Sequence, residues 1–177
     1  MDSEIRKKIN QIIDDSDFIL AGVGEELDAS YAGEDVQRKI RDAYDDMVRM
    51  FRGKPYFVLT QNPDHLIFES KITSLFISAP YCTRPPEYPD QEKQWNSYLN
   101  WLGSAPSKKA CLMLLGVGIM QPQLIRWPFE KTAKIAQKSH LITVHHSLAF
   151  LPEGLDGRGT AVRENAADFA AEMISGS

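Results

Sequence analysis

The sequence predicts an α/β fold class: a single Rossmann-like three-layer domain with a parallel β-sheet, over residues 1–177. Three observations lead to this prediction. Short apolar runs of strand length alternate with longer segments whose apolar residues recur at helical spacing, which is typical of βαβ units. Two of the short runs are followed at once by Gly-x-Gly, and a third is followed by a turn made almost entirely of polar residues.

In the first half of the chain, the apolar spacing indicates amphipathic helices and the short apolar runs indicate buried strands. Helices are expected at 2–14, 34–51 and 66–70, and strands at 17–22, 56–59 and 72–77. Gly53-Lys54-Pro55 is expected to end the second helix.

In the second half, helices are expected at 91–102, 123–137 and 164–174, and strands at 110–115 and 141–144. Pro128 is expected to kink or restart the helix that contains it. The proline-rich segment 79–90 and the glycine-containing segment 152–159 are predicted to be loops. No internal repeat or domain linker is visible.

The composition argues against several classes of protein. Hydrophobic residues make up 43% and charged residues 25%, which is ordinary for a globular domain. A net charge of −4 without a basic stripe argues against nucleic-acid binding. No apolar run approaches the roughly 20 residues that a membrane-spanning helix needs. Two cysteines, Cys82 and Cys111, and no signal peptide suggest a cytoplasmic location.

The polar turn 60–65, Thr-Gln-Asn-Pro-Asp-His, is the strongest candidate for a functional site. It follows a buried strand, and ligands of open α/β sheets bind beyond the carboxyl ends of the strands. The alternative is that Asn62 and Asp64 only cap the following helix. Gln61 and His65 beside them favour a site, because a cap needs only one such residue.

The Gly-x-Gly segments 22–24 and 116–118 have two interpretations. Glycine at a strand end allows backbone N–H groups to approach a phosphate, but it also suits a tight turn. Neither segment completes G-x-G-x-x-G, so each alone is weak evidence. If Glu25 and Glu26 face the pocket, they would repel an anion, and a neutral or cationic ligand would then be expected instead of a dinucleotide.

His145 and His146 follow the last predicted strand and are candidates for metal ligands or a general base. No third ligand lies at a convincing spacing in the sequence, so no metal site is predicted.

Several motifs together resemble the sirtuins, NAD-dependent protein deacylases and ADP-ribosyltransferases with a DHS-like NAD-binding domain. The turn TQNPDHLI resembles their Thr-Gln-Asn-x-Asp hallmark, and FILAGVG resembles their Gly-Ala-Gly strand end. LLGVGIMQPQLIRWPFE is similar to the Gly-Val-Gly segment of the macrodomain-linked class, and HLITVHH is similar to the last strand. The resemblance covers most of the chain.

This resemblance implies a ligand and a set of contacts. The first glycine loop would hold the phosphates of NAD or ADP-ribose, the polar turn would surround the nicotinamide and its ribose, and the last strand would contact the adenosine half. Asn62 and Asp64 would be the catalytic residues. The implied cofactor-binding residues are Gly22, Gly24, Gln61, Asn62, Asp64, Gly116, Gly118 and His145.

The chain also departs from the sirtuin pattern. Ala79 and Pro80 stand where the family has its catalytic His-Gly or Gln-Gly, and the four-cysteine zinc module is absent, so no zinc is expected. Glu26 stands at the position of a serine, and His145 at that of an asparagine. Ordinary protein deacylation is therefore not expected.

Three hypotheses remain open from the sequence. The first is an enzyme that cleaves or transfers at the nicotinamide–ribose bond, with water or a protein as acceptor; Asn62 would position the acceptor, and Asp64 would stabilise the developing positive charge. The second is a non-catalytic nucleotide sensor or binding module. The third is a structural or oligomer-forming protein whose glycine turns bind nothing.

Overall fold

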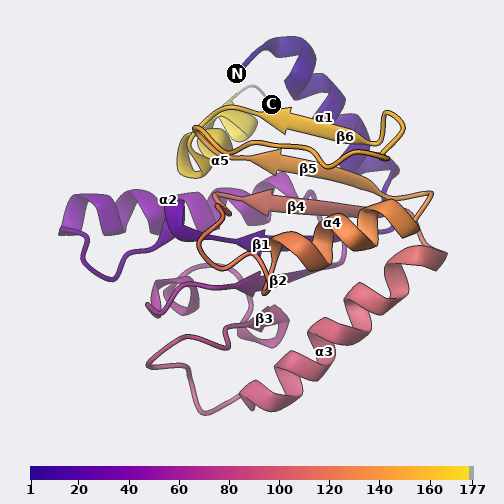
Figure 1. The fold of residues 1–177 in the computed structure, drawn as a ribbon. Helices are drawn as coiled ribbons and strands as arrows, with labels where there is room; N and C mark the ends of the chain where they lie inside the picture. Colours follow the sequence, from indigo (N-terminus) through magenta and orange to yellow (C-terminus); the bar gives the residue numbers. More distant parts are fainter. Residues whose placement is uncertain (176–177) are drawn as a thin grey trace.

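Six parallel strands form the middle layer of the structure, a computed structural model that describes residues 1–175 (Figure 1). Their order across the sheet is β3-β2-β1-β4-β5-β6, and every neighbouring pair is parallel. The strands are β1 (Phe18–Val23), β2 (Tyr56–Thr60), β3 (Ile77–Ser78), β4 (Ala110–Leu115), β5 (His140–Val144) and β6 (Gly159–Val162). The predicted α/β class with a parallel sheet is confirmed.

Helices cover both faces of this sheet. Those of the described residues are α1 (Ser3–Asp15), α2 (Glu34–Met50), α3 (Gln91–Ser104), α4 (Arg126–Ile135) and α5 (Ala166–Ser175), with 3₁₀ turns η1 (Glu25–Leu27), η2 (Leu66–Glu69), η3 (Ser74–Phe76) and η4 (Ala105–Ser107). Buried side chains of α1, α2 and α5 belong to one hydrophobic cluster, and those of α3 and α4 belong to the other. The result is a three-layer arrangement.

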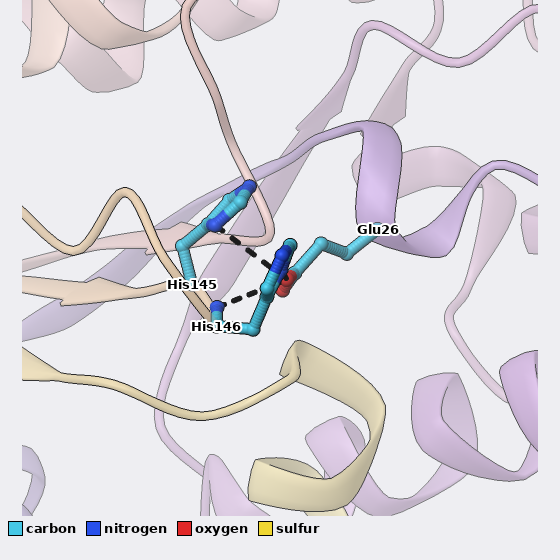
Figure 2. Close-up of side chains that lie close together, drawn as sticks. All are labelled: Glu26, His145 and His146. Carbon is cyan, nitrogen blue, oxygen red and sulfur yellow. Dashed lines mark hydrogen bonds and ion pairs between the residues drawn. The ribbon is translucent and has the colours of Figure 1, made fainter.

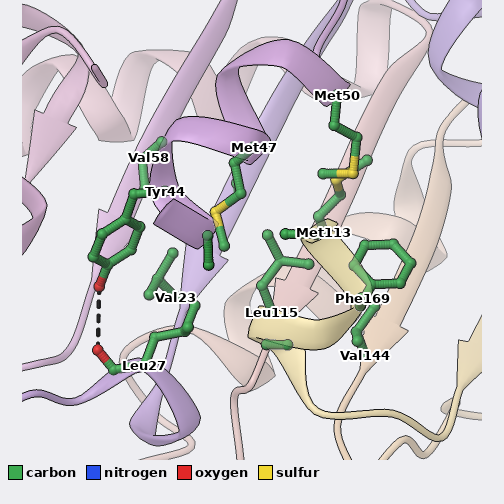
Figure 3. Packing of buried hydrophobic residues seen from close by; sticks show 14 of the residues in the cluster. Val23, Leu27, Tyr44, Met47, Met50, Val58, Met113, Leu115, Val144 and Phe169 are labelled. Atoms are coloured by element: carbon green, nitrogen blue, oxygen red, sulfur yellow. Dashed lines mark hydrogen bonds between the residues drawn. The ribbon is translucent and has the colours of Figure 1, made fainter. Parts of the chain in front are cut away.

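The central strands are apolar along their whole length because both of their faces are buried. In β1, Ile19 and Ala21 pack into the cluster under α1, α2 and α5, whereas Phe18 and Leu20 pack into the cluster under α3 and α4. Figure 3 shows the first of these clusters, in which methionines and aromatic rings from α2 and α5 lie against side chains of the strands.

Several predicted boundaries were wrong. The third strand was expected at 72–77 but is only Ile77–Ser78, because η3 occupies residues 74–76. The expected helix at 66–70 is the 3₁₀ turn η2. The segment 152–159 was predicted to be a loop, yet β6 begins at Gly159 and pairs with β5 at the sheet edge. Short strands with few apolar residues carry little periodic signal.

Helix α4 begins at Arg126, not at residue 123 as expected, and it continues without interruption through Pro128 to Ile135. Pro128 is the third residue of this helix. A proline in the first turn needs no backbone N–H partner, so it is tolerated there without distortion.

The strand order has a switch point between β1 and β4. The chain proceeds outward from β1 to β3, crosses back to β4, and proceeds outward again to β6. The carboxyl ends of these strands are level, since Gly24 N–H donates to Leu115 O (3.0 Å) and Gln61 N–H donates to Val23 O (3.1 Å). Open α/β sheets bind ligands in the crevice at such a switch point.

Among residues 1–175, no helix combines the length and the apolar character needed to cross a membrane.

Candidate functional site

The two Gly-x-Gly loops pack directly against each other at the switch point. A Cβ on Gly24 would lie 2.5 Å from both Gly116 O and Val117 Cα. Gly116 itself has a φ of +65°, which residues with a side chain rarely adopt. Glycine is therefore needed at position 24 for the close approach of the two backbones, and at position 116 for the left-handed conformation of the backbone. Of the two interpretations of the Gly-x-Gly segments, phosphate binding and a tight turn, the structure shows a conformational role.

At position 22, a side chain is excluded for a different reason. It lies inside β1, and a Cβ there would stand 2.2 Å from Ile125 Cγ2 at the start of α4. The space beside Gly22 is therefore filled by the protein core.

Glu25 points into the crevice between the loops. A Cβ on Gly118 would lie 1.7 Å from Glu25 Oε1, so this carboxylate covers Gly118. Gln61 Nε2 donates a hydrogen bond to Glu25 Oε2 (2.8 Å). The amide oxygen of Gln61 is buried and has no hydrogen-bond partner within residues 1–175.

Glu26 also points inward, and its side chain is only 5% exposed. Its carboxylate accepts hydrogen bonds from the backbone N–H of Ala166 (3.0 Å) and of His146 (3.0 Å), and from His146 Nδ1. Ala166 is the first residue of α5, and the amino end of a helix is where an anion is favoured. A carboxylate of the protein itself thus occupies this position.

Both glutamates therefore face the crevice, which decides the question that the sequence left open. A phosphate beside the Gly-x-Gly loops would meet two carboxylates, and neither forms an ion pair with a lysine or arginine of residues 1–175. Negatively charged groups in contact with each other repel strongly where water is scarce. This arrangement disfavours a phosphate here unless the two side chains move or a cation neutralises them.

Asn62 is 3% exposed and holds the first glycine loop in place. Its Nδ2 donates to Gly24 O (2.9 Å), and its backbone N–H donates to Thr60 Oγ1 (3.1 Å). The side chain also lies beside the hydroxyl of Tyr44, which donates to Leu27 O (3.2 Å). Asn62 thus connects the ends of β1 and β2.

Asp64 lies in a different environment from Asn62. Its carboxylate accepts hydrogen bonds from the backbone N–H groups of Ala29 (3.0 Å) and Leu66 (2.8 Å). Partial burial raises the pKa of Asp64 above its ordinary value, and the neighbouring Asp28 acts in the same direction, while the two backbone donors oppose them. No lysine or arginine within residues 1–175 forms an ion pair with Asp64.

A cavity of about 400 Å³ opens beside Asp64 at the carboxyl edge of the sheet. Its walls come from the segment after η1, from α2, from the polar turn and η2, and from the loop after β3. They consist of Ala29, Ser30, Tyr31, Gln37, Pro63, Asp64, His65, Leu66, Glu69, Thr83 and Arg84. Of the predicted catalytic and cofactor-binding residues, Asp64 alone lines this cavity, together with its neighbours Pro63 and His65 of the polar turn; Gln61, Asn62, His145 and the glycines do not.

His145 shapes the turn after β5. Its Nδ1 accepts hydrogen bonds from the backbone N–H groups of Ser147 (3.1 Å) and Leu148 (3.0 Å), so the ring proton is on Nε2. Burial lowers the pKa of His145, against the opposing effect of Glu26.

His145 and His146, the candidate metal ligands of the sequence, form a cluster with a third residue, Glu26, which the sequence did not suggest as a ligand (Figure 2). One possible ligand atom from each of Glu26, His145 and His146 lies within 4.8 Å of the others. The sequence separation of 120 residues between Glu26 and His146 hides this relation. Only the adjacency of β1, β4 and β5 in the sheet brings the three residues together.

Arg126 is a second site residue that the sequence did not single out for this role. It is buried, and its guanidinium donates to the carbonyls of Gly118 (2.9 Å), Leu148 (3.0 Å) and Val117. It also pairs with Glu130 (3.4 Å). Arg126 thus fixes the second Gly-x-Gly loop against the turn after β5.

No protein-family model matches the chain, and a search of curated proteins finds no match.

Proposed function

We propose that this chain is a sirtuin-like ligand-binding module whose ligand enters the cavity beside Asp64. The ligand presents a neutral or cationic group there, such as the nicotinamide–ribose portion of NAD. The resemblance of the polar turn to the sirtuin hallmark suggests this portion, and the cavity itself carries the proposal. Its volume of about 400 Å³ lies within the range of small-molecule sites, and it lies at the carboxyl edge of the sheet, on the β2 side of the switch point.

The charge of Asp64 favours a neutral or cationic group beside it, whereas Arg84, which also lines the cavity, would favour an anionic one. Glu69 is already paired with Arg41 (2.9 Å) and His65 (3.1 Å), whereas Asp64 accepts only backbone N–H groups among the described residues. A pyridinium or an oxocarbenium-like ribose would give Asp64 a countercharge. Tyr31, a fully exposed aromatic residue of the cavity wall, offers a ring on which a heterocycle can stack.

The same electrostatics predict an order of affinities. If the phosphates of NAD or ADP-ribose followed the glycine loops, they would meet Glu25 and Glu26. Nicotinamide riboside, a cation without phosphate, should therefore bind more tightly than NAD, and ADP-ribose should bind most weakly. Calorimetric titration of the purified chain with these three compounds tests the order.

Asp64→Asn should weaken binding of nicotinamide riboside by about tenfold, because a favourable charge pair is lost. Asp156→Asn is the matched control, since this exposed residue has a φ of +50° that asparagine tolerates. Unfolding of both variants must be measured, because Asp64 also orders two backbone groups. Tighter binding of ADP-ribose than of nicotinamide riboside would refute the charge argument. Failure of all three compounds to bind at millimolar concentration would refute the proposed ligand-binding module and favour a structural role for the chain.

Catalysis at the nicotinamide–ribose bond is a second candidate, which the position of Asp64 in the cavity favours. A carboxylate there stabilises positive charge that develops on the ribose. Asn62, by contrast, donates a hydrogen bond to Gly24 O and does not line the cavity. In this arrangement it does not reach the water or protein group that would accept the ribose. Release of nicotinamide from NAD that stops in Asp64→Ala would establish an enzyme, and binding without release would establish the module.

A further inference from the structure

The cluster of Glu26, His145 and His146 lies apart from the proposed ligand cavity and shares no residue with its walls. The glutamate comes from the turn after β1, and the histidines come from the end of β5 (Figure 2). Two imidazoles and one carboxylate form a donor set that suits transition metals.

The first argument is electrostatic. Glu26 is a nearly buried carboxylate, and within residues 1–175 its only basic side-chain partners closer than 4.0 Å are the two histidines. Glu25 adds a second carboxylate beside the same loops. Buried negative charge is costly without a permanent countercharge. A divalent cation would supply it.

The second argument concerns the lone pairs of the donor atoms. Because His145 Nδ1 accepts two backbone N–H groups, it carries no proton, and its single in-plane lone pair, which a metal would require, is shared with these two donors. A metal ion would have to displace them. His145 Nδ1 lies 3.6 Å from Glu26 Oε1. Two ligands of a tetrahedral zinc ion, each about 2.0–2.1 Å from the metal, are about 3.3 Å apart. Moving these two atoms by a few tenths of an ångström would therefore bring them to coordination distance.

The carboxylate is also held in a way that leaves one oxygen directed at the histidines. Ala166 N–H donates to Glu26 Oε2, whereas Oε1 faces both histidine rings. Such support by a neighbouring donor orients a metal ligand.

His146 is the adjustable member of the cluster. Its side chain is 65% exposed, and within the described residues its ring forms a hydrogen bond to Glu26 alone. The rings of His145 and His146 are stacked, with centroids 4.7 Å apart. The ring of His146 must swing outward to admit an ion, and its exposure makes that movement possible. The exposed side leaves room for water at the remaining position.

We infer that Glu26, His145 and His146 bind one divalent transition-metal ion of the zinc class. The nitrogen donors exclude a site built for Mg²⁺ or Ca²⁺, which prefer oxygen ligands alone. The ion has to compete with the two backbone donors on His145, so binding should be weaker than in a closed structural zinc site.

The test is titration of the untagged, chelator-treated chain with ZnCl₂ by calorimetry and with CoCl₂ by visible absorption. One ion per chain is expected. His146→Ala should weaken binding by about tenfold or more, since even residues that only orient ligands have effects of that size. Because His146 is exposed, this variant should keep the fold. Glu26→Gln should weaken binding as well, but it removes a buried hydrogen-bond acceptor and needs a parallel unfolding measurement.

His65→Ala is the matched control, because His65 is a half-exposed histidine beside another carboxylate, that of Glu69. Zinc affinity should be unchanged in this variant. Loss of binding in His65→Ala would place the ion at that other pair and overturn the inference. Wild-type affinity in His146→Ala, or no binding of either metal by the wild-type chain, would overturn it too.

Discussion

Replacing Gly116 by alanine tests whether the two Gly-x-Gly loops are built to pack against each other. Gly116 has a φ of +65°, and a Cβ there would lie 2.7 Å from Glu26 Cβ and 3.2 Å from Ala166 Cβ. Gly154 is the matched control, since its φ is +81° but a Cβ would meet nothing within 4 Å. Both variants strain the backbone, whereas only Gly116→Ala also creates a collision.

The expected magnitudes follow from these two contributions. A non-glycine residue in the left-handed region costs about 1–2 kcal/mol, which applies to both variants. The collision at Gly116 adds about 1–3 kcal/mol, because both contacted atoms are Cβ atoms and cannot rotate away from the backbone. Gly116→Ala should therefore lower the free energy of unfolding by about 2–5 kcal/mol and Gly154→Ala by about 1–2 kcal/mol.

Equilibrium unfolding in denaturant, followed by circular dichroism, measures this difference. Equal destabilisation of the two variants would show that the loops relax freely, and the packing explanation of Gly24 and Gly116 would then fail. In that case the loops would be flexible enough for Glu25 and Glu26 to move away from a bound phosphate.

Two further predictions concern stability. Arg126→Met should lower the free energy of unfolding by about 3 kcal/mol or more, because three backbone carbonyls lose a charged donor. Arg163 is exposed, so the control Arg163→Met should change the free energy of unfolding by less than about 0.5 kcal/mol. Equal effects of the two substitutions in denaturant titrations would contradict this prediction. Burial lowers the pKa of His140 from 6.5 to about 4, so the unfolded chain binds this proton first as the pH falls. The contribution of His140 to stability is therefore complete above pH 6.5 and is lost as the pH falls towards 4. Between pH 6.5 and 4, the free energy of unfolding should decrease less steeply with falling pH in His140→Gln than in the wild-type chain. An unchanged slope would refute the lowered pKa of His140.

The helices and central strands were predictable because they carry strong local signals. The run Ala110–Leu115 is apolar at every position, as a strand buried on both faces must be, and it is β4. The edge strand Gly159–Val162 was missed, since it is buried at alternate positions and flanked by loop residues. The extent of β3 was overestimated because apolar residues before Ile77 form a 3₁₀ turn.

The candidate site was predictable only in part. That Asp64 would lie at the carboxyl edge follows from its position after a strand, and the cavity beside it agrees with that expectation. That Asn62 would turn inward to Gly24 O could not be read from a turn in which every residue is polar. Binding of NAD or ADP-ribose, and catalysis by Asn62 and Asp64, stay predictions.

By itself, the sequence determined the α/β class, the central strands and the presence of polar and glycine-rich turns at strand ends, because these depend on local periodicity and backbone preference. Only the tertiary structure decided what those turns do. The directions of Glu25 and Glu26, the contact between Gly24 and Gly116, and the meeting of Glu26 with His145 all depend on strand order. Strand order is a property of long-range packing, which no local stretch of sequence encodes.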